Sequence, residues 1–265
     1  MTQLWRLIRT GIFNAYENMA IDHVLLDGLH KDTAANTVRF YRWNPSAVSI
    51  GRFQHLEDEV NVEACRKLNI DIVRRISSGG AVYHDFEGEL TYSIICRTDE
   101  TNLPTDVIET YQHICAGLLK ALNRLGVHGK FSHGSERLCP NIFVKKRKIS
   151  GNAQSRRGNT LLQHGTILRS LDLSKMFTVL KVNKGQADEA FIQQAAQKLT
   201  SLHHELEKTP AFGQIEEALV DGLGAALPAR FYEEGLTDAE LQSARHLATS
   251  WYASPEWSYQ RGFKH

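Results

Sequence analysis

Apolar and polar positions follow two different periods along the first two thirds of the chain. Between Asn14 and Leu29 the apolar residues recur every three or four positions, which predicts a helix capped by Asn14. The same period predicts a long helix over Val107–Leu125 and a short one over Val60–Leu68. Segments of β type are Thr37–Trp43, Ala47–Gly51, Ile70–Arg75, Ala81–His84, Leu90–Cys96, Ile142–Val144, Lys148–Gln154 and Leu161–Arg169. We expect Ala81–His84 and Leu90–Cys96 to be neighbouring strands, because only a short turn-like segment separates them.

After Leu171 the pattern becomes mostly helical, over Ser174–Val179, Glu189–Lys198, Gly213–Leu223 and Thr237–Trp251. Mixed strands and helices followed by a helical tail predict an α+β fold, in which helices flank a mixed or antiparallel β-sheet. No linker or repeat interrupts the chain, so we expect a single domain over residues 1–265. Its segment 172–265 would be a mostly helical extension. No strand runs into a GxGxxG or P-loop sequence, which argues against a doubly wound nucleotide-binding fold.

Composition narrows the class of protein further. The chain has 265 residues, of which 42% are hydrophobic and 23% charged, as in ordinary globular proteins. Its 31 basic and 30 acidic side chains nearly cancel, so no nucleic-acid partner is expected. The apolar runs are too short for a membrane helix, and the N-terminus does not resemble a signal peptide. Four scattered cysteines without metal-ligand spacing indicate a reduced, cytoplasmic protein with no metal cluster.

The segment Arg74–Asp85, with the sequence RRISSGGAVYHD, is the first candidate for chemistry. Consecutive small residues and glycines let backbone N–H groups approach a ligand and form an anion-binding nest. The two arginines at its start have donors suited to phosphate. A plain β-hairpin with exposed basic residues is the alternative interpretation of this segment.

A second candidate segment, Lys145–Gln154, begins with four consecutive cations. Along a regular strand, Lys148 and the three polar residues that alternate after it would share one face. We expect that face to line a site, although a solvated hairpin turn is the usual fate of such a charge run.

Two further residues are candidates on weaker grounds. His164 interrupts an apolar strand just before a glycine, which often marks a close backbone approach. Cys139 lies nine residues before Lys148, and a nearby cation could lower its pKa and make it a nucleophile. Buried structural roles are the alternative for both.

Three segments in the same order, RRISSGGAVYHD, KISGNAQ and QHGTIL, resemble the signature of the lipoate–protein ligase A family. This family is in the superfamily of biotin and lipoate ligase catalytic domains, so the resemblance implies a biotin/lipoate ligase-like fold. It extends from about Leu4 to Leu168.

The resemblance implies a two-step ligase. Lipoate and ATP, with Mg²⁺, would give lipoyl-AMP, and the lipoyl group would then pass to a lysine of a lipoyl carrier domain. Such domains belong to the 2-oxoacid dehydrogenase E2 or glycine-cleavage H-type proteins. No tightly bound prosthetic group is implied. Lys148 would be the catalytic residue, contacting the α-phosphate and the acyl carbonyl, where it would stabilise developing negative charge. The implied nucleotide- and lipoyl-binding residues are Arg75, Ser78, Gly79, Gly80, Ala81, Val82, Tyr83, His84, Asp85, Asn141, Ser150, Gly151, Asn152, Ala153, Gln154, His164, Gly165 and Thr166.

Two departures from the family pattern bear on this interpretation. Ser78 stands where the family often has a glycine, and no separate C-terminal accessory domain follows, so a separate accessory subunit could be needed. The alternative is an ATP-independent octanoyltransferase that uses Cys139 as its acyl-thioester nucleophile and takes the acyl group from acyl carrier protein. Relatives of that class have Gly-Gly-Arg at Ser78–Gly80 and a cysteine further from the lysine. We therefore expect the ligase.

Overall fold

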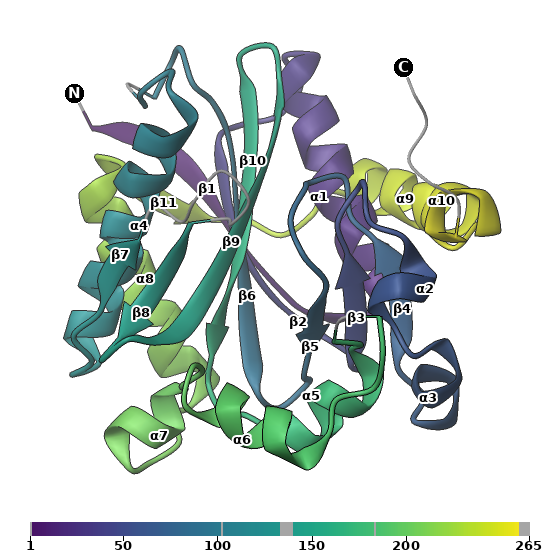
Figure 1. The fold of residues 1–265 in the computed structure, drawn as a ribbon. Helices are drawn as coiled ribbons and strands as arrows, with labels where there is room; N and C mark the ends of the chain where they lie inside the picture. The colour runs from purple at the N-terminus through teal and green to yellow at the C-terminus, as the bar shows by residue number, and fades with distance from the viewer. Residues whose placement is uncertain (1, 102, 133–139, 183, 260–265) are drawn as a thin grey trace.

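The computed structural model describes residues 2–101, 103–132, 140–182 and 184–259, and this part of the chain folds around two β-sheets (Figure 1). The larger sheet has eight strands, in the order β11-β1-β2-β6-β10-β9-β8-β7, and the smaller has three, in the order β4-β3-β5. The large sheet consists of β1 (Gln3–Phe13), β2 (Thr37–Trp43), β6 (Glu89–Arg97), β7 (Lys130–Ser132), β8 (Asn141–Val144), β9 (Arg147–Arg157), β10 (Thr160–Leu168) and β11 (Ala229–Glu233). The small sheet consists of β3 (Ala47–Ile50), β4 (Asp71–Arg74) and β5 (Val82–His84).

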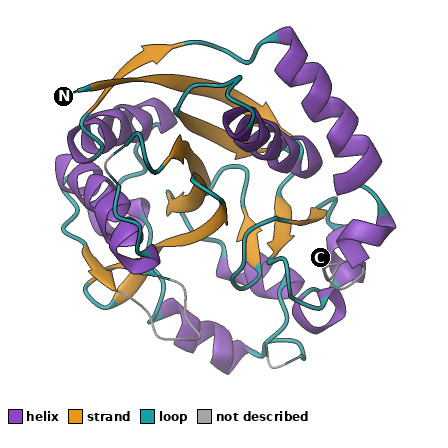
Figure 2. Ribbon diagram, turned by 90° about the horizontal axis from the view of Figure 1, so that it is seen from above, coloured by secondary structure: helices purple, strands orange, loops and turns teal. Residues whose placement is uncertain are grey.

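Most of the helices lie around the outside of the molecule in the view from above, although strands reach the edge near the N-terminus (Figure 2). The α-helices are α1 (Ala15–His30), α2 (Leu56–Glu59), α3 (Val62–Lys67), α4 (Val107–Arg124), α5 (Leu173–Val179), α6 (Glu189–Ala196), α7 (Leu202–Leu206), α8 (Phe212–Ala226), α9 (Asp238–Leu247) and α10 (Pro255–Tyr259), and the π-helical turn η1 (Ala248–Tyr252) follows α9. The predicted cap of α1 is present, because the Asn14 side chain accepts a hydrogen bond from the N–H of Glu17.

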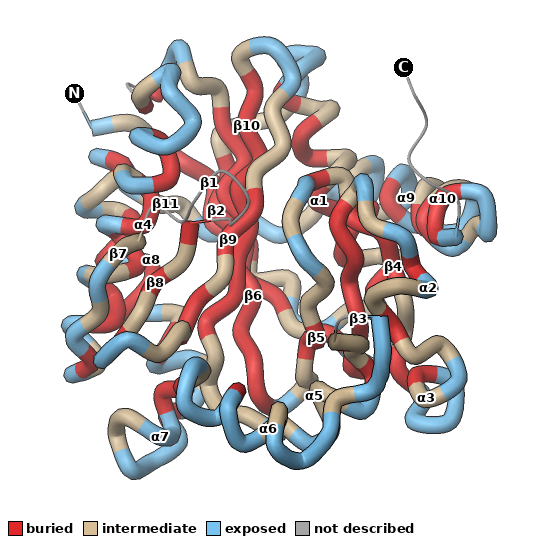
Figure 3. Tube along the Cα trace, in the orientation of Figure 1, coloured by how far each residue is buried: buried red, intermediate tan, exposed pale blue. Residues whose placement is uncertain are grey.

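The large sheet is buried on both faces, whereas the outer faces of the helices are exposed (Figure 3). Alternate residues of its strands enter different cores, as the pleat requires. Leu7 and Phe40 belong to the core beneath α4 and α8, whereas Ile8 and Tyr41 belong to the core beneath α1 and α9. The small sheet has its own core with α2, α3 and α5.

One of the predictions about the strands is wrong. Strands β5 and β6 are not neighbours, because β5 pairs with β3 whereas β6 pairs with β2 and β10. The turn between them therefore carries the chain from one sheet to the other. The C-terminal part is mostly helical, as predicted, but it also contributes the strand β11, which pairs in parallel with β1 and which the sequence pattern did not reveal.

A β-bulge in β9 also overturns the expected row of polar side chains. Phe143 pairs with Lys148 but Ile142 pairs with Ser150, so Ile149 is an extra residue in the ladder. An extra residue shifts the alternation of faces by one position. Lys148 therefore shares a face with Gly151, whereas the polar residues Ser150, Asn152 and Gln154 belong to the opposite face.

Candidate functional site

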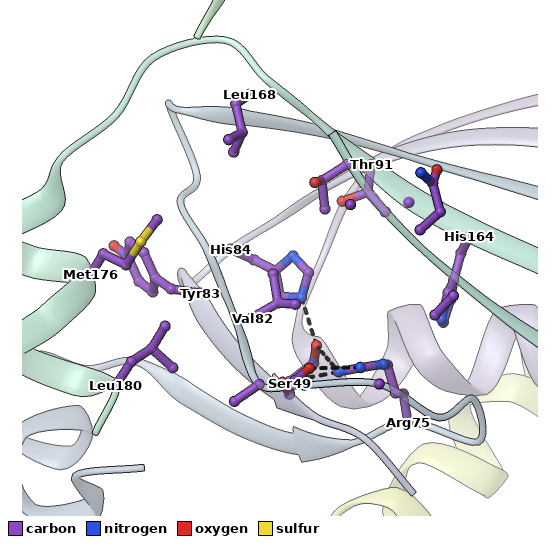
Figure 4. Close-up of a pocket in the computed structure, with 18 of the residues that line it drawn as sticks. Ser49, Arg75, Val82, Tyr83, His84, Thr91, His164, Leu168, Met176 and Leu180 are labelled. Carbon is purple, nitrogen blue, oxygen red and sulfur yellow. Dashed lines mark hydrogen bonds between the residues drawn. The ribbon is translucent and has the colours of Figure 1, made fainter. Parts of the chain in front are cut away.

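A cavity of about 290 Å³ lies between the large sheet and strands β3 and β5, with α5 along one side (Figure 4). Most of the residues expected at a binding site line it. These are Arg75, Gly79, Gly80, Ala81, Val82, Tyr83, His84, Asn141, Lys148, Gly151, Asn152, Ala153, His164, Gly165 and Thr166. Segments far apart in the sequence thus meet around one space.

One side of the cavity is apolar. Val82 and Tyr83 come from β5, Leu168 from the end of β10, and Met176 and Leu180 from α5 and the residue after it (Figure 4). Concave sites lined by apolar side chains with a few polar groups are typical of small-molecule binding. This side of the cavity fits an aliphatic chain.

Arg75 directs its guanidinium group at oxygen atoms of the protein. Its Nη2 donates to the carbonyl oxygens of Ser78 and Gly80, at 3.0 and 2.7 Å. Its Nη1 donates to the backbone and side-chain oxygens of Ser49, and its Nε donates to the Ser77 hydroxyl. An arginine has five N–H donors, so these contacts engage its full fork. The donors that the sequence suggested for phosphate therefore hold the glycine turn in place.

Arg74 holds a neighbouring turn in place by similar hydrogen bonds. Its Nη1 donates to three carbonyl oxygens between Gly51 and Gln54, and its Nε donates to the carbonyl oxygen of Trp257 in α10. Burial lowers the pKa of Arg74 below its ordinary value. The two consecutive arginines thus connect the rim of the cavity to the body of the protein.

Lys148 lies beside a glycine because of the bulge in β9. A Cβ atom placed on Gly151 would be 3.0 Å from Lys148 Nζ, and 3.7 Å from the side-chain oxygen of Asn141. A glycine at this position lets the ammonium group lie along the strand at the cavity wall. A cation there can stabilise negative charge on a carbonyl oxygen bound in the cavity.

Ser49, His84 and Glu89 form a chain of hydrogen bonds along the cavity wall. Ser49 Oγ is 2.8 Å from His84 Nε2, and His84 Nδ1 is 2.7 Å from Glu89 Oε1. The Thr91 hydroxyl donates to the same carboxylate oxygen and accepts from the Trp43 indole. All of these side chains are buried.

His164 belongs to a similar chain on the other side of Arg75. Its Nε2 is 2.6 Å from the Ser77 hydroxyl, and its Nδ1 is 3.6 Å from Asp22. Burial lowers the pKa of His164 although Asp22 acts in the opposite direction. Burial raises the pKa of Asp22, but Arg39 and His164 lower it more, so that pKa lies below its ordinary value. The Asp22 carboxylate is therefore ionised, and His164 is neutral near neutral pH.

Four of the expected residues do not line the cavity. Asp85 accepts hydrogen bonds from the N–H groups of Glu87 and Gly88, which shapes the turn between the two sheets. Gln154 donates to Gln163 on the α4 side of the sheet, and Ser150 is buried on that side too. Ser78 contributes its carbonyl oxygen to Arg75. Cys139 lies outside the described residues.

The other three cysteines are free thiols in buried positions. Burial raises the pKa of Cys65 to about 12, and that of Cys96 to about 12. Burial also raises the pKa of Cys115 well above its ordinary value. A thiol is nucleophilic only as the thiolate, so these three cysteines are unsuited to acyl transfer.

Sequence reasoning missed several residues of the site. Ser49 and Thr91 lie in apolar strands and gave no signal of their own. Glu89 and Asp22 carried a signal that could have been used, because each is a charged residue within an apolar element. A buried carboxylate needs a partner, so each indicates a basic residue in contact with it.

The described residues lack both a metal-binding cluster and a membrane-spanning helix. They contain no group of three or more His, Cys, Asp or Glu side chains arranged to hold a metal ion. Among the helices formed by these residues, none has both the length and the apolar character needed to cross a bilayer.

Curated relatives resemble the chain over its whole length. Octanoyltransferase LipM of Clostridioides difficile (strain 630) is 34% identical over 97% of this chain and 99% of the relative. Octanoyltransferase LipM of Bacillus subtilis (strain 168) is 32% identical over 98% of this chain and 99% of the relative.

Solved structures resemble the fold equally completely. A bipartite lipoate protein ligase of Thermoplasma acidophilum, described with its E2 lipoyl domain, superposes with a TM-score of 0.82 at 25% identity and covers 99% of both chains. Lipoate-protein ligase A bound with ATP gives a TM-score of 0.81 at 24% identity over 98% of this chain and 99% of that chain. These likenesses confirm the predicted α+β fold with its helical C-terminal part.

The expectation of an ATP-dependent lipoate ligase is wrong. The full-length relatives that share about a third of their residues with this chain are octanoyltransferases. The motifs misled because their residues shape the cavity: Arg75 holds the glycine turn and Lys148 lies at the wall.

A family model completes the comparison. The lipoyl protein ligase A/B catalytic domain matches residues 14–224, which include every strand that lines the cavity. The family model, the relatives and the solved structures therefore all describe enzymes that act on lipoyl or octanoyl groups. The chain belongs to the lipoyl protein ligase A/B catalytic domain family.

Proposed function

We propose that this protein transfers an octanoyl group from a thioester of acyl carrier protein to a lysine of a lipoyl carrier domain, without ATP. The observation that carries the proposal is the similarity to octanoyltransferase LipM, at 34% identity over 97% of the chain. The apolar side of the cavity supports it, because an octanoyl chain is entirely aliphatic.

Cys139 is the proposed nucleophile. It precedes Asn141 by two residues, and Asn141 lines the cavity. The raised pKa values of Cys65, Cys96 and Cys115 argue against the other three thiols. The Cys139 thiolate would attack the carbonyl of the octanoyl thioester, and the C–S bond to the carrier would break. The lysine amine of the acceptor would then displace Cys139 and form the amide.

Lys148 is the proposed electrostatic catalyst of both steps. Each step passes through a tetrahedral species whose former carbonyl oxygen carries negative charge. The position of Lys148 Nζ at the cavity wall, next to Gly151, suits a contact with that oxygen.

The acceptor is proposed to be a lipoyl domain of the E2 or glycine-cleavage H type. In support, the structural relative from Thermoplasma acidophilum is a ligase described with its E2 lipoyl domain. A thioester is already activated, so this reaction does not call for the accessory subunit that the ligase interpretation allowed.

The test is a transfer assay with purified protein. Octanoyl-acyl carrier protein and an apo lipoyl domain, without ATP, are expected to yield a lipoyl domain heavier by one octanoyl group in mass spectrometry. Cys139→Ser should abolish this transfer, whereas Cys65→Ala, which removes a buried thiol, should retain it. Transfer that requires octanoate or lipoate with MgATP, and fails with the thioester, would refute the proposal.

A further inference from the structure

We propose that Ser49, His84 and Glu89 form a proton relay that removes a proton from the acceptor lysine before it attacks the acyl group. This inference rests on the proposed function and adds three residues to it. A lysine side chain reaches the enzyme as an ammonium ion, which has no lone pair and cannot act as a nucleophile. The enzyme must therefore take up one proton for each amide that it forms.

The direction of the hydrogen bonds follows from groups that can only donate. The Trp43 indole N–H donates to Thr91 Oγ1 at 2.7 Å, so the Thr91 hydroxyl donates its own proton to Glu89 Oε1 at 2.7 Å. Glu89 Oε1 also faces His84 Nδ1 at 2.7 Å, so we assign the proton of a neutral His84 to Nδ1.

With Nδ1 protonated, His84 Nε2 has a free lone pair, and it lies 2.8 Å from Ser49 Oγ. Arg75 Nη1 donates to Ser49 Oγ at 3.2 Å (Figure 4). An arginine beside this oxygen disfavours a second proton on it. A proton that arrives at Ser49 from the cavity therefore moves on to His84.

His84 is surrounded by groups that stabilise an imidazolium ion. Glu89 accepts its Nδ1 proton, and the second carboxylate oxygen of Glu89 is buried without a hydrogen-bond partner among the described residues. The Trp43 ring stacks on the imidazole, with centroids 4.0 Å apart and an angle of 16° between the planes. An aromatic face attracts a cation. This is the arrangement that holds the histidine of a Ser-His-Asp triad in one tautomer and stabilises its charged form.

Ser49 provides the link to the substrate, because Ser49 and Lys148 line the same cavity. Lys148 and Arg75 are both cations that line this cavity, so an acceptor ammonium entering it is destabilised relative to the neutral amine. The proton of that ammonium passes to Ser49 Oγ as the Ser49 proton passes to His84 Nε2. The neutral amine then attacks the acyl carbonyl, the C–N bond forms and the C–S bond to Cys139 breaks. The second amine proton goes to the departing thiolate, and His84 later releases its proton to water.

A second hydroxyl in the structure has matching contacts and serves as the control. Ser77 Oγ accepts from Arg75 Nε at 3.2 Å and lies 2.6 Å from His164 Nε2. Ser77 does not line the cavity. Removing either hydroxyl disturbs Arg75 in a similar way, but only Ser49 belongs to the proposed relay.

The experiment compares two acceptors of the same acyl-enzyme. The enzyme is first charged with octanoyl-acyl carrier protein, and the adduct is measured by intact-mass spectrometry. It is then mixed with an apo lipoyl domain or with hydroxylamine, an amine that is uncharged at neutral pH and has no proton to lose first. The unfolded acyl-enzyme also reacts with hydroxylamine, and this uncatalysed rate is subtracted from the rate measured with the folded acyl-enzyme.

Ser49→Ala and Glu89→Gln should slow transfer to the lipoyl domain by about a hundredfold or more, the range of general base catalysis, and change the hydroxylamine rate by less than about twofold. Ser49→Thr, which keeps a hydroxyl, should restore much of the loss. Ser77→Ala should change both rates in equal proportion.

Equal losses with both acceptors in the Ser49 and Glu89 variants would show a structural role and overturn the relay, as would the absence of any loss. Failure of the parent protein to form an acyl-enzyme would overturn the proposed function, and the relay with it. Measuring the acyl-enzyme before the acceptor is added therefore distinguishes failure of the relay from failure of the proposed function.

Discussion

Arg75 Nη2 lies 2.7 Å from the carbonyl oxygen of Gly80, and this hydrogen bond ties the glycine turn to the strand that leads into it. The same guanidinium group reaches Ser49 in β3 and Ser77 in the turn. A single buried side chain thus sets the spacing between two walls of the cavity.

The first prediction is that Arg75→Lys impairs both stability and transfer, although it conserves the charge. A lysine cannot reproduce the planar fork, so the carbonyl oxygens of Ser78 and Gly80 would lose their donor. A hydrogen bond to a charged group contributes about 1.5–3 kcal/mol. Urea unfolding measures the loss. Arg157→Lys, at an exposed ion pair with Asp27, should change stability by less than about 1 kcal/mol. Equal stabilities of the two variants would contradict the structural role of Arg75.

The second prediction concerns Lys148. Lys148→Ala should lower kcat for octanoyl transfer by about 100- to 1000-fold, the usual cost of one group that stabilises an oxyanion, without changing the unfolding midpoint much. Lys130→Ala, an exposed lysine on β7, is the control and should transfer normally. Retention of more than about a tenth of the parent kcat by Lys148→Ala would exclude the assignment.

The third prediction uses two glycines at the cavity rim. A Cβ atom on Gly51 would clash with the carbonyl oxygen of Gly79, whereas one on Gly80 would meet nothing within 4 Å. Gly51→Ala should therefore lower the free energy of unfolding by at least about 1–3 kcal/mol, the usual cost of overpacking. Gly80→Ala should leave it nearly unchanged. Thermal or urea unfolding measures both, and the reverse order of stabilities would show that the two turns are not in contact.

The fourth prediction is a loss of stability in mild acid. Burial lowers the pKa of His164 in the folded protein, so below the unfolded value of about 6.5 the unfolded chain binds a proton that the folded chain does not. Stability therefore falls as pH decreases from about 6.5 towards the folded pKa. The lowered pKa of Asp22 adds a further loss only below about pH 4, where its carboxylate becomes protonated in the unfolded chain. His164→Gln should flatten the dependence between about pH 6.5 and 5, with the exposed His246→Gln as control. An unchanged slope in His164→Gln would count against this origin.

The fifth prediction distinguishes the cysteines by their reactivity. At neutral pH, iodoacetamide should modify the native protein at no more than one thiol, because Cys65, Cys96 and Cys115 are buried and their pKa values are raised. Peptide mass spectrometry identifies the modified residue, which we expect to be Cys139. In urea all four should react. Rapid native modification of Cys96 would contradict its buried position.

Local periodicity identified most of the elements that build the site but not the pairing between them. The segments over α1, α4 and β10 have patterns long enough to reveal their type from neighbouring residues alone. The pairing of β1 with β11 joins segments more than 200 residues apart, so no local pattern could predict it.

In the candidate site, too, short segments predicted the residues but not how they are paired. The arginines, the glycine turn and Lys148 were identified from short segments, and most of them line the cavity. The face that Lys148 occupies depends on the extra residue Ile149, whose effect on register is visible only when β8 and β9 are paired. Ser49 is brought to His84 by the pairing of β3 with β5, so that contact could not be inferred along the sequence.

The parallel pairing of β1 with β11 has a consequence for how the protein is made. Gln3 pairs with Ala229 and Leu7 with Glu233, so β1 leaves the ribosome long before β11, one of its two neighbours in the sheet, has been synthesised. Until then the backbone groups on one side of β1 have no permanent partner, and an unpaired strand edge invites association with other chains. This topology therefore requires that the open edge of β1 be protected until β11 has been synthesised.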